Sequence, residues 1–160
     1  MAISVTDVFD DPHAVADTIA VGQPLVVLEV LEHMDRRVQF LGTFQPPAAF
    51  VRDGYPTEKA LIVVTRSGPP RAIPVGSARA WQHRNGPLEL CLWFDGDPRG
   101  LRWEWDDGFA SYVGIVHRHL TYEEYWRRTG QWPVEDVPHG QGDHPVRTLN
   151  MHWKAQLWDR

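Results

Sequence analysis

Two histidines and a glutamate in the second half of the chain have types and spacing that could hold a metal ion. His117 and His119 are two residues apart, and Glu123 follows in the same stretch. In an extended strand, side chains two residues apart point to the same side, so both imidazoles would face one site. Imidazole nitrogens and carboxylate oxygens are common zinc ligands. The alternative is that these histidines lie at a strand end and hydrogen-bond to Glu123 or to a backbone carbonyl.

The string HRHLTYE, which ends at Glu123 and is followed by Gly130, resembles the second half of the first cupin motif. Ser111 stands where that motif has its leading glycine. Residues that resemble parts of the second cupin motif are Pro138, His139, Gly140, His144 and Asn150. The resemblance implies a small-molecule-binding barrel or a metal-dependent enzyme that uses His117, His119 and Glu123.

The chain contains eight tryptophans, a high number for 160 residues. Tryptophan packs well between a sheet and a helix, and it also offers a flat surface on which a sugar, a base or an aromatic ligand can stack. Both uses remain open from the sequence. If a pocket exists, we expect it on the concave face of a sheet, lined by Trp81, Trp93, Trp103, Trp105 or Tyr112.

The charge pattern bears on the kind of partner. The net charge is −5, and a nucleic-acid-binding protein needs a basic face, so no nucleic acid is expected. Acidic residues occur in pairs, which indicates either solvated turns and a solvated helix face or a surface that attracts a basic protein partner. The residues of this predicted partner-binding surface are Asp106, Asp107, Glu123, Glu124, Trp126, Glu135 and Asp136.

Cysteine content and hydropathy indicate the compartment. Cys91 is the single cysteine of the chain, so an internal disulfide and a CxxC metal site are both excluded. The start of the chain, MAISVTDVFDD, is acidic where a signal peptide would be basic. Apolar runs stay well below the roughly 18 residues of a membrane span. We therefore expect a cytoplasmic protein without a membrane partner, folded as a single domain over residues 1–160.

The first half of the chain predicts one helix and three strands. Asp11 followed by Pro12 is a typical helix start, and the helix would end near residue 21. Nearly continuous apolar runs predict buried strands. These runs cover residues 24–32, 36–42 and 60–65, and the proline-rich loop 43–58 carries one expected helical turn at 48–51.

The second half predicts a meander and a short helix. Turn signals for hairpins occur at residues 85–86, 95–96 and 107–108. Alternating side chains predict strands at 101–105 and 109–119, and Thr121 with Glu124 forms the capping box of a helix over 121–129. The predicted fold is therefore α+β: an antiparallel meander sheet of six to eight strands, which could curl into a half-barrel, with an N-terminal helix and a short helix near 121–129.

The predicted order of strand, Asp-Gly turn, strand and short helix, followed by the string TGQWP, resembles a known family. The Asp-Gly turn is Asp107-Gly108, and EEYWRRTGQWP covers residues 123–133. The order is similar to the C-terminal half of actinobacterial immunity proteins that neutralise polymorphic toxins. The resemblance implies a non-catalytic, cytoplasmic protein that plugs the active site of a toxin. Acidic pairs and the 43–58 loop would suit that role.

Three functional hypotheses follow. The preferred one is a non-catalytic protein-binding module, immunity-like, with an acidic contact surface for a protein partner. The second is a small-molecule-binding barrel or a metal-dependent enzyme that uses the two histidines and Glu123. The third is a structural subunit of a larger assembly, in which exposed tryptophans form the contact. No cofactor is expected, apart from a divalent metal under the second hypothesis.

Overall fold

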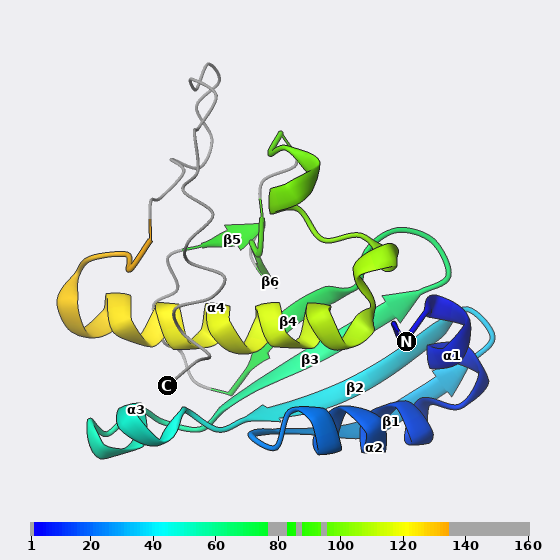
Figure 1. The fold of residues 1–160 in the computed structure, drawn as a ribbon, viewed down its shortest axis with the longest axis horizontal. Coiled ribbons are helices and arrows are strands. Elements are labelled where there is room, and N and C mark those ends of the chain that lie inside the picture. Colours follow the sequence, from blue (N-terminus) through cyan, green and yellow to red (C-terminus); the bar gives the residue numbers. More distant parts are fainter. Residues whose placement is uncertain (1, 77–82, 86–87, 94–95, 135–160) are drawn as a thin grey trace.

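Two short helices begin the fold. In the computed structural model, residues 2–76, 83–85, 88–93 and 96–134 are described, and α1 (Val5–Asp10) and α2 (Pro12–Gly22) come first (Figure 1). Ser4 caps α1 through a capping box with Asp7. The Asp11 carboxylate accepts a hydrogen bond of 3.0 Å from a backbone amide in the first turn of α2. The helix predicted from Asp11 is therefore confirmed, whereas α1 was not predicted.

Four antiparallel strands follow in a meander with the order β1-β2-β3-β4. Their bounds are β1 (Val26–Met34), β2 (Arg37–Phe44), β3 (Glu58–Thr65) and β4 (Arg71–Val75). The short helix α3 (Ala48–Arg52) lies in the loop between β2 and β3. The three strands and the helical turn predicted in the first half of the chain are confirmed, with bounds that differ by a few residues.

The predicted meander of six to eight strands is only partly correct. A separate pair of very short strands, β5 (Arg84–Asn85) and β6 (Glu89–Leu90), forms a two-stranded sheet. The predicted strand at 101–105 is wrong, because the 3-10 turns η1 (Arg99–Leu101) and η2 (Trp105–Asp107) occupy this region. In the described part of the chain, the strands do not close into a barrel.

The largest correction concerns residues 109–119, which we predicted to be a strand. They form the first half of α4 (Phe109–Thr129), a single helix of 21 residues, and the predicted helix 121–129 is its end. The residues that alternate as in a strand also fit the 3.6-residue period of a helix. The buried residues at helical spacing are Phe109, Tyr112, Val113, Val116 and Leu120. No new helix begins at Thr121, whose hydroxyl instead donates to the carbonyl of His117.

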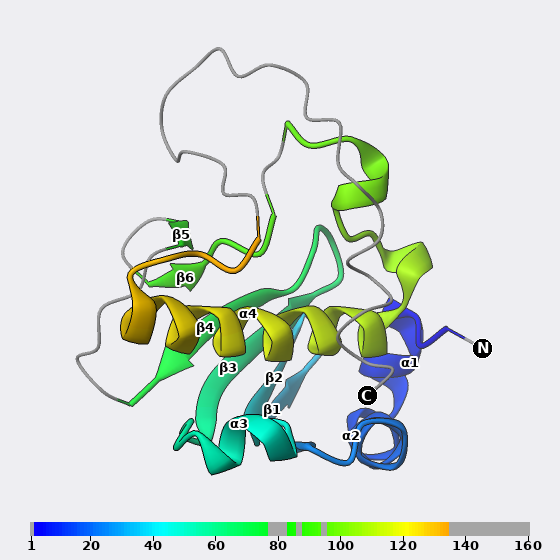
Figure 2. The same ribbon diagram turned by 60° about the vertical axis from the view of Figure 1, so that its left-hand side comes forward.

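Helix α4 lies across the sheet, and α2 lies beside β1 (Figures 1 and 2). Side chains from α1, α2 and α4 share one apolar core with the same face of the sheet. Near its centre, the ring of Phe40 on β2 packs 5.4 Å from the ring of Phe109 on α4. Among the described helices, none is long and apolar enough to cross a membrane. The core thus fixes one side of α4 and leaves its other side outside the core.

Candidate functional site

A groove runs along the outer side of the first half of α4. Its volume is about 750 Å³, which lies within the range of pockets that hold small ligands or short peptide segments. Three parts of the chain line it: residues 22–25 after α2, residues 99–103 with Asp107, and one side of α4 from Ala110 to Arg118. The groove therefore depends on the packing of α2 and of the η1–η2 segment against α4.

Three small residues lie on the α4 side of this groove, beside Ile115, His117 and Arg118. Ala110, Ser111 and Gly114 lie there, and a methyl group added to Gly114 would come no closer than 3.8 Å to Gln23. That distance is an ordinary van der Waals contact, so a methyl group at this position would pack against the side chain of Gln23 without a clash. The amide of Gln23 donates to the carbonyl of Ala110 at 2.7 Å and ties the end of α2 to α4. This bond holds one wall of the groove in place.

The groove is richer in positive than in negative side chains. Arg99, Arg102 and Arg118 line it together with Asp107. Arg99 lies 2.8 Å from Glu104 and 3.1 Å from Asp107, and the hydrogen bond to Asp107 raises its pKa. Arg118 is partly removed from water, and this burial lowers the pKa of its guanidinium. Arg99 therefore holds the η1–η2 wall together, and Arg102 and Arg118 line the groove from the η1–η2 segment and from α4.

The expected metal geometry of His117 and His119 is wrong, because it required a strand. In a helix, residues two apart point in directions that differ by about 200°. His117 Nε2 lies 2.7 Å from the carbonyl oxygen of Gln45, and burial lowers the pKa of His117. His119 Nε2 lies 3.3 Å from Glu123 Oε1. In the part of the chain that the structure describes, no three His, Cys, Asp or Glu side chains form a candidate metal site.

Glu123 belongs to a buried polar cluster: its contact with His119 agrees with the alternative stated from the sequence, whereas its bond to His83 was not predicted. Its side chain is fully buried and accepts a 2.9 Å hydrogen bond from the backbone amide of His83, in addition to the contact with His119. The ring of Trp132 covers His83, with the ring centroids 4.0 Å apart. His83 was missed because nothing in the local pattern links it to a helix 40 residues further on. Glu123 is thus unable to serve in an acidic contact surface.

The other predicted partner-binding residues do not gather on one face. Asp106 and Asp107 precede α4, whereas Glu124 lies near its far end and is bound at 2.8 and 2.7 Å to the two arginines that follow it. Trp126 is half-buried. Glu135 and Asp136 lie outside the described residues. The acidic groups that we can place are therefore spread along the helix and largely paired within the protein.

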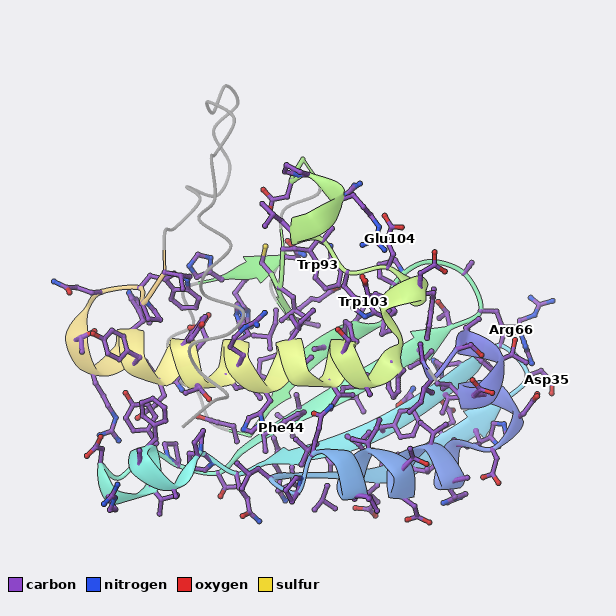
Figure 3. All side chains as sticks on the ribbon, in the orientation of Figure 1. Asp35, Phe44, Arg66, Trp93, Trp103 and Glu104 are labelled. Atoms are coloured by element: carbon purple, nitrogen blue, oxygen red, sulfur yellow. The ribbon has the colours of Figure 1, made fainter. Side chains whose placement is uncertain are left out.

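Four of the five predicted pocket residues do come together, as an aromatic cluster near the start of α4. Figure 3 labels two of them, Trp93 and Trp103. The ring of Trp103 lies 4.9 Å from Trp105, 5.3 Å from Tyr112 and 6.4 Å from Trp93. Trp103 Nε1 donates to the carbonyl of Gly108 at 3.1 Å, and its side chain also lines the groove. These residues stand beside the helix instead of on a concave sheet face, and Trp81 lies outside the described residues.

No protein-family model matches the chain, and the search of curated proteins found no match. The similarities to cupins and to immunity proteins stay predictions. We therefore identify the candidate site from three structural features: the groove, the charged side chains that line it, and the hydrogen bonds that hold its walls in place.

Proposed function

We propose that the protein is a non-catalytic protein-binding module that holds a segment of its partner in the groove between α2 and α4. The groove is the observation that carries the proposal. On its α4 side, Ser111 and Gly114 lie outside the core, whereas Ala110 and Ile115 pack against it. A bound segment could contact this surface without disturbing the packing beneath it.

The walls of the groove are fixed before a partner arrives. The amide of Phe109 donates to the carbonyl of Ile3 at 2.8 Å, which ties the chain start to the beginning of α4. Glu104 and Asp107 form a reciprocal capping box around η2. A site that is ordered beforehand loses less conformational entropy on binding, so a modest contact area can still give useful affinity.

The specific form that we propose is immunity-like neutralisation of a toxin. The end of α4 fits the pattern that carries this resemblance, because Thr129 is the last helical residue and Gly130 takes the left-handed conformation with φ 72° before Trp132-Pro133. The two strands expected before it are replaced by 3-10 turns and by the first half of α4. A basic partner was predicted from the acidic pairs. Since Glu123 is buried and Glu124 is paired within the helix, we place the contact in the groove instead.

The proposal can be tested by filling the groove with a large side chain. Ser111 is exposed and lines the groove, so Ser111→Trp should occupy the space while Ser111→Ala should leave it open. Each variant is titrated calorimetrically against the protein encoded by the neighbouring gene, and each is tested for protection of cells that express that protein. Binding and protection should be lost in Ser111→Trp alone, with equal melting temperatures for both variants.

Equal affinity of both Ser111 variants would show that the groove is not the contact. If the wild-type chain neither binds the neighbouring gene product nor protects cells, immunity-like neutralisation is wrong for that product. The metalloenzyme and assembly-subunit hypotheses gain no support from His117, which contacts the Gln45 carbonyl, or from Trp103, which is buried. Binding of a small molecule is the alternative that the volume of the groove also allows.

A further inference from the structure

We infer that the face of the sheet that lies away from the helices is the interface of a homodimer, in which a second copy of the chain stacks face to face on the first. The inference goes beyond the proposed function, because the groove is lined by α4 and by the end of α2 and therefore lies on the helix side. Three observations carry it: which residues share this face, how apolar and exposed they are, and where its charges lie.

The register of the four strands shows which residues share this face. Residues that pair directly across antiparallel strands point to the same side of a sheet, because side chains alternate along each strand. None of the residues in two neighbouring rows belongs to the apolar core that the sheet shares with α1, α2 and α4. They therefore lie opposite α4, which crosses the other face (Figure 2), on what we call the outer face. From β1 to β4, the rows are Val27, Thr43, Lys59, Val75 and Glu29, Leu41, Leu61, Ile73.

The outer face presents apolar side chains to water on all four strands. Val27 on β1 is 53% exposed, and Val75 on β4 is 44% exposed. Between these edges, Leu41, Leu61 and Ile73 are half-buried. An apolar patch that extends across a whole sheet, with polar residues among it, marks a surface that binds another protein.

The charged residues of the two rows differ in sign and lie on different strands. Glu29 lies on the edge strand β1, and Lys59 lies on β3, two strands away. Both side chains are exposed. Among the described residues, neither of them takes part in an ion pair. Each charge is therefore available to a group of opposite sign on a second molecule.

These charges favour one arrangement of the two copies. A two-fold dimer buries the same surface on both chains, and here its axis can run across the strands or along them. An axis across the strands, along the row of Leu41 and Leu61, would set each Glu29 against Glu29 of the second copy. An axis along the strands, between β2 and β3, lays β1 over β4 and β2 over β3. Leu41 then faces Leu61, and Glu29 approaches Lys59 of the second copy.

Apolar contact and charge have separate tasks in this dimer. Sheets that stack face to face lie about 10 Å apart, with side chains from both faces interdigitating and water excluded between them. Exposed ion pairs add little affinity, whereas like charges set against each other oppose the wrong arrangement. The apolar residues of the outer face should therefore set the strength of the dimer, and Glu29 and Lys59 its orientation.

Sedimentation equilibrium of the full chain tests the inference with a matched pair of variants. Val27→Glu puts a charge on the outer face, and Val51→Glu makes the same change in α3, at a valine of nearly equal exposure, 53% against 55%. The residues after α3 are held by Arg128 of α4, so Val51 lies on the helix side. Circular dichroism and the melting temperature show whether each variant is folded.

We expect the wild type to dimerise and Val27→Glu to raise the dissociation constant of the dimer by about tenfold or more, because a charge would be buried against apolar side chains. Val51→Glu should change the constant by less than about twofold. A wild-type chain that stays monomeric at about 100 μM would overturn the inference. A dimer that the two variants weaken equally, or that Val27→Glu leaves unchanged, would overturn it too, because the contact would then lie elsewhere.

A charge reversal tests the arrangement and does not depend on Val27→Glu being folded. Glu29→Lys and Lys59→Glu each set like charges against each other across the interface, and each should weaken the dimer by about threefold or more. The double variant restores opposite charges and should return to within about twofold of the wild type. A double variant that dimerises more weakly than both single variants, or single variants without effect, would overturn the stacking along the strands.

Discussion

The two halves of α4 are held to the protein in different ways. In the first half, Phe109, Tyr112 and Val116 are fully buried and pack among other apolar and aromatic side chains. In the second half, buried Glu123 and the ion pairs of Arg127 do much of the anchoring. The apolar contacts of the first half lie on one side of α4. Its other side is therefore left to line the groove.

The aromatic contacts of the first half are numerous and mutually supporting. The ring of Phe109 lies 5.4 Å from Phe40 on the sheet and 6.2 Å from Tyr112 on the next helical turn. Aromatic side chains bury large areas and gain further from ring contacts. This half should therefore unfold only with the core.

The polar contacts of the second half reach two neighbouring segments. Arg127 lies 2.9 Å from Glu58 at the start of β3, and Arg128 donates to the carbonyls of Asp53 and Gly54 at 2.8 and 2.6 Å. The guanidinium of Arg128 also lies 4.5 Å from the ring centroid of Tyr55. Charged groups thus hold the loop between β2 and β3 against the end of α4. Because these contacts include ionisable side chains, the free energy of unfolding should depend on pH.

The largest effect is expected for the apolar half. Phe109→Ala should lower the free energy of unfolding by about 3–5 kcal/mol, because it leaves a cavity beneath the helix. Urea denaturation followed by circular dichroism measures the loss. A loss below about 1 kcal/mol would show that the first half of α4 is not anchored by this packing.

A smaller effect is expected for the buried carboxylate of the polar half. Glu123→Ala should cost about 2 kcal/mol, because the amide of His83 then lacks the acceptor that it has at 2.9 Å. Glu123→Gln keeps an oxygen at that place and should cost clearly less. Urea denaturation of both variants checks the order. Equal losses would show that the negative charge of Glu123, which both variants lack, and not the oxygen that accepts from His83, decides the stability at this position.

The smallest effect is expected for the ion pairs at the end of the helix. Arg127→Met should cost about 1 kcal/mol at neutral pH, because Glu124 keeps its second ion pair, with Arg128, when Arg127 is removed. Burial alone would raise the pKa of Glu124, but hydrogen bonds from Arg127 and Arg128 outweigh it, and the pKa lies below 4.5. The stabilising contribution of Glu124 is therefore present above pH 4.5 and is lost as the pH falls through the lower pKa of the folded state.

In Arg127→Met, the loss of stability on acidification should consequently be shallower than in the wild type. Urea denaturation between neutral pH and the acid limit measures it. Arg52→Met, in the exposed last turn of α3, is the control for removal of one surface arginine. Parallel pH curves for wild type and Arg127→Met would contradict the proposed role of this ion pair.

The comparison also shows which parts of the fold the sequence could predict. The helix after Asp11 and strands β1 to β3 follow from a cap and from apolar runs, which are local signals. Residues 109–119 satisfy two periods at once, and their valines and isoleucine favour a strand in isolation. The contact of Phe109 with Phe40, far apart in the sequence, favours the helix. Tertiary packing overrode local preference here.

The candidate site was less predictable than the fold. Trp103 was expected to line a pocket and does line the groove, but Arg102 and Arg118 carry no joint signal in the sequence. They line one groove because the η1–η2 segment and α4 both border it, whereas we predicted strands at 101–105 and 109–119. The small residues at 111 and 114 would have shared a face with Arg118 on a helical wheel, had the segment been treated as a helix.

The central claim is that the groove over the first half of α4 holds the partner, and hydrogen exchange tests it most directly. Backbone amide exchange is measured across the whole chain with and without the bound partner. We predict that exchange slows in residues 22–25 and 99–103, whose segments form two walls of the groove. Slower exchange confined to β1 or to the last turns of α4, with these two segments unchanged, would contradict the claim.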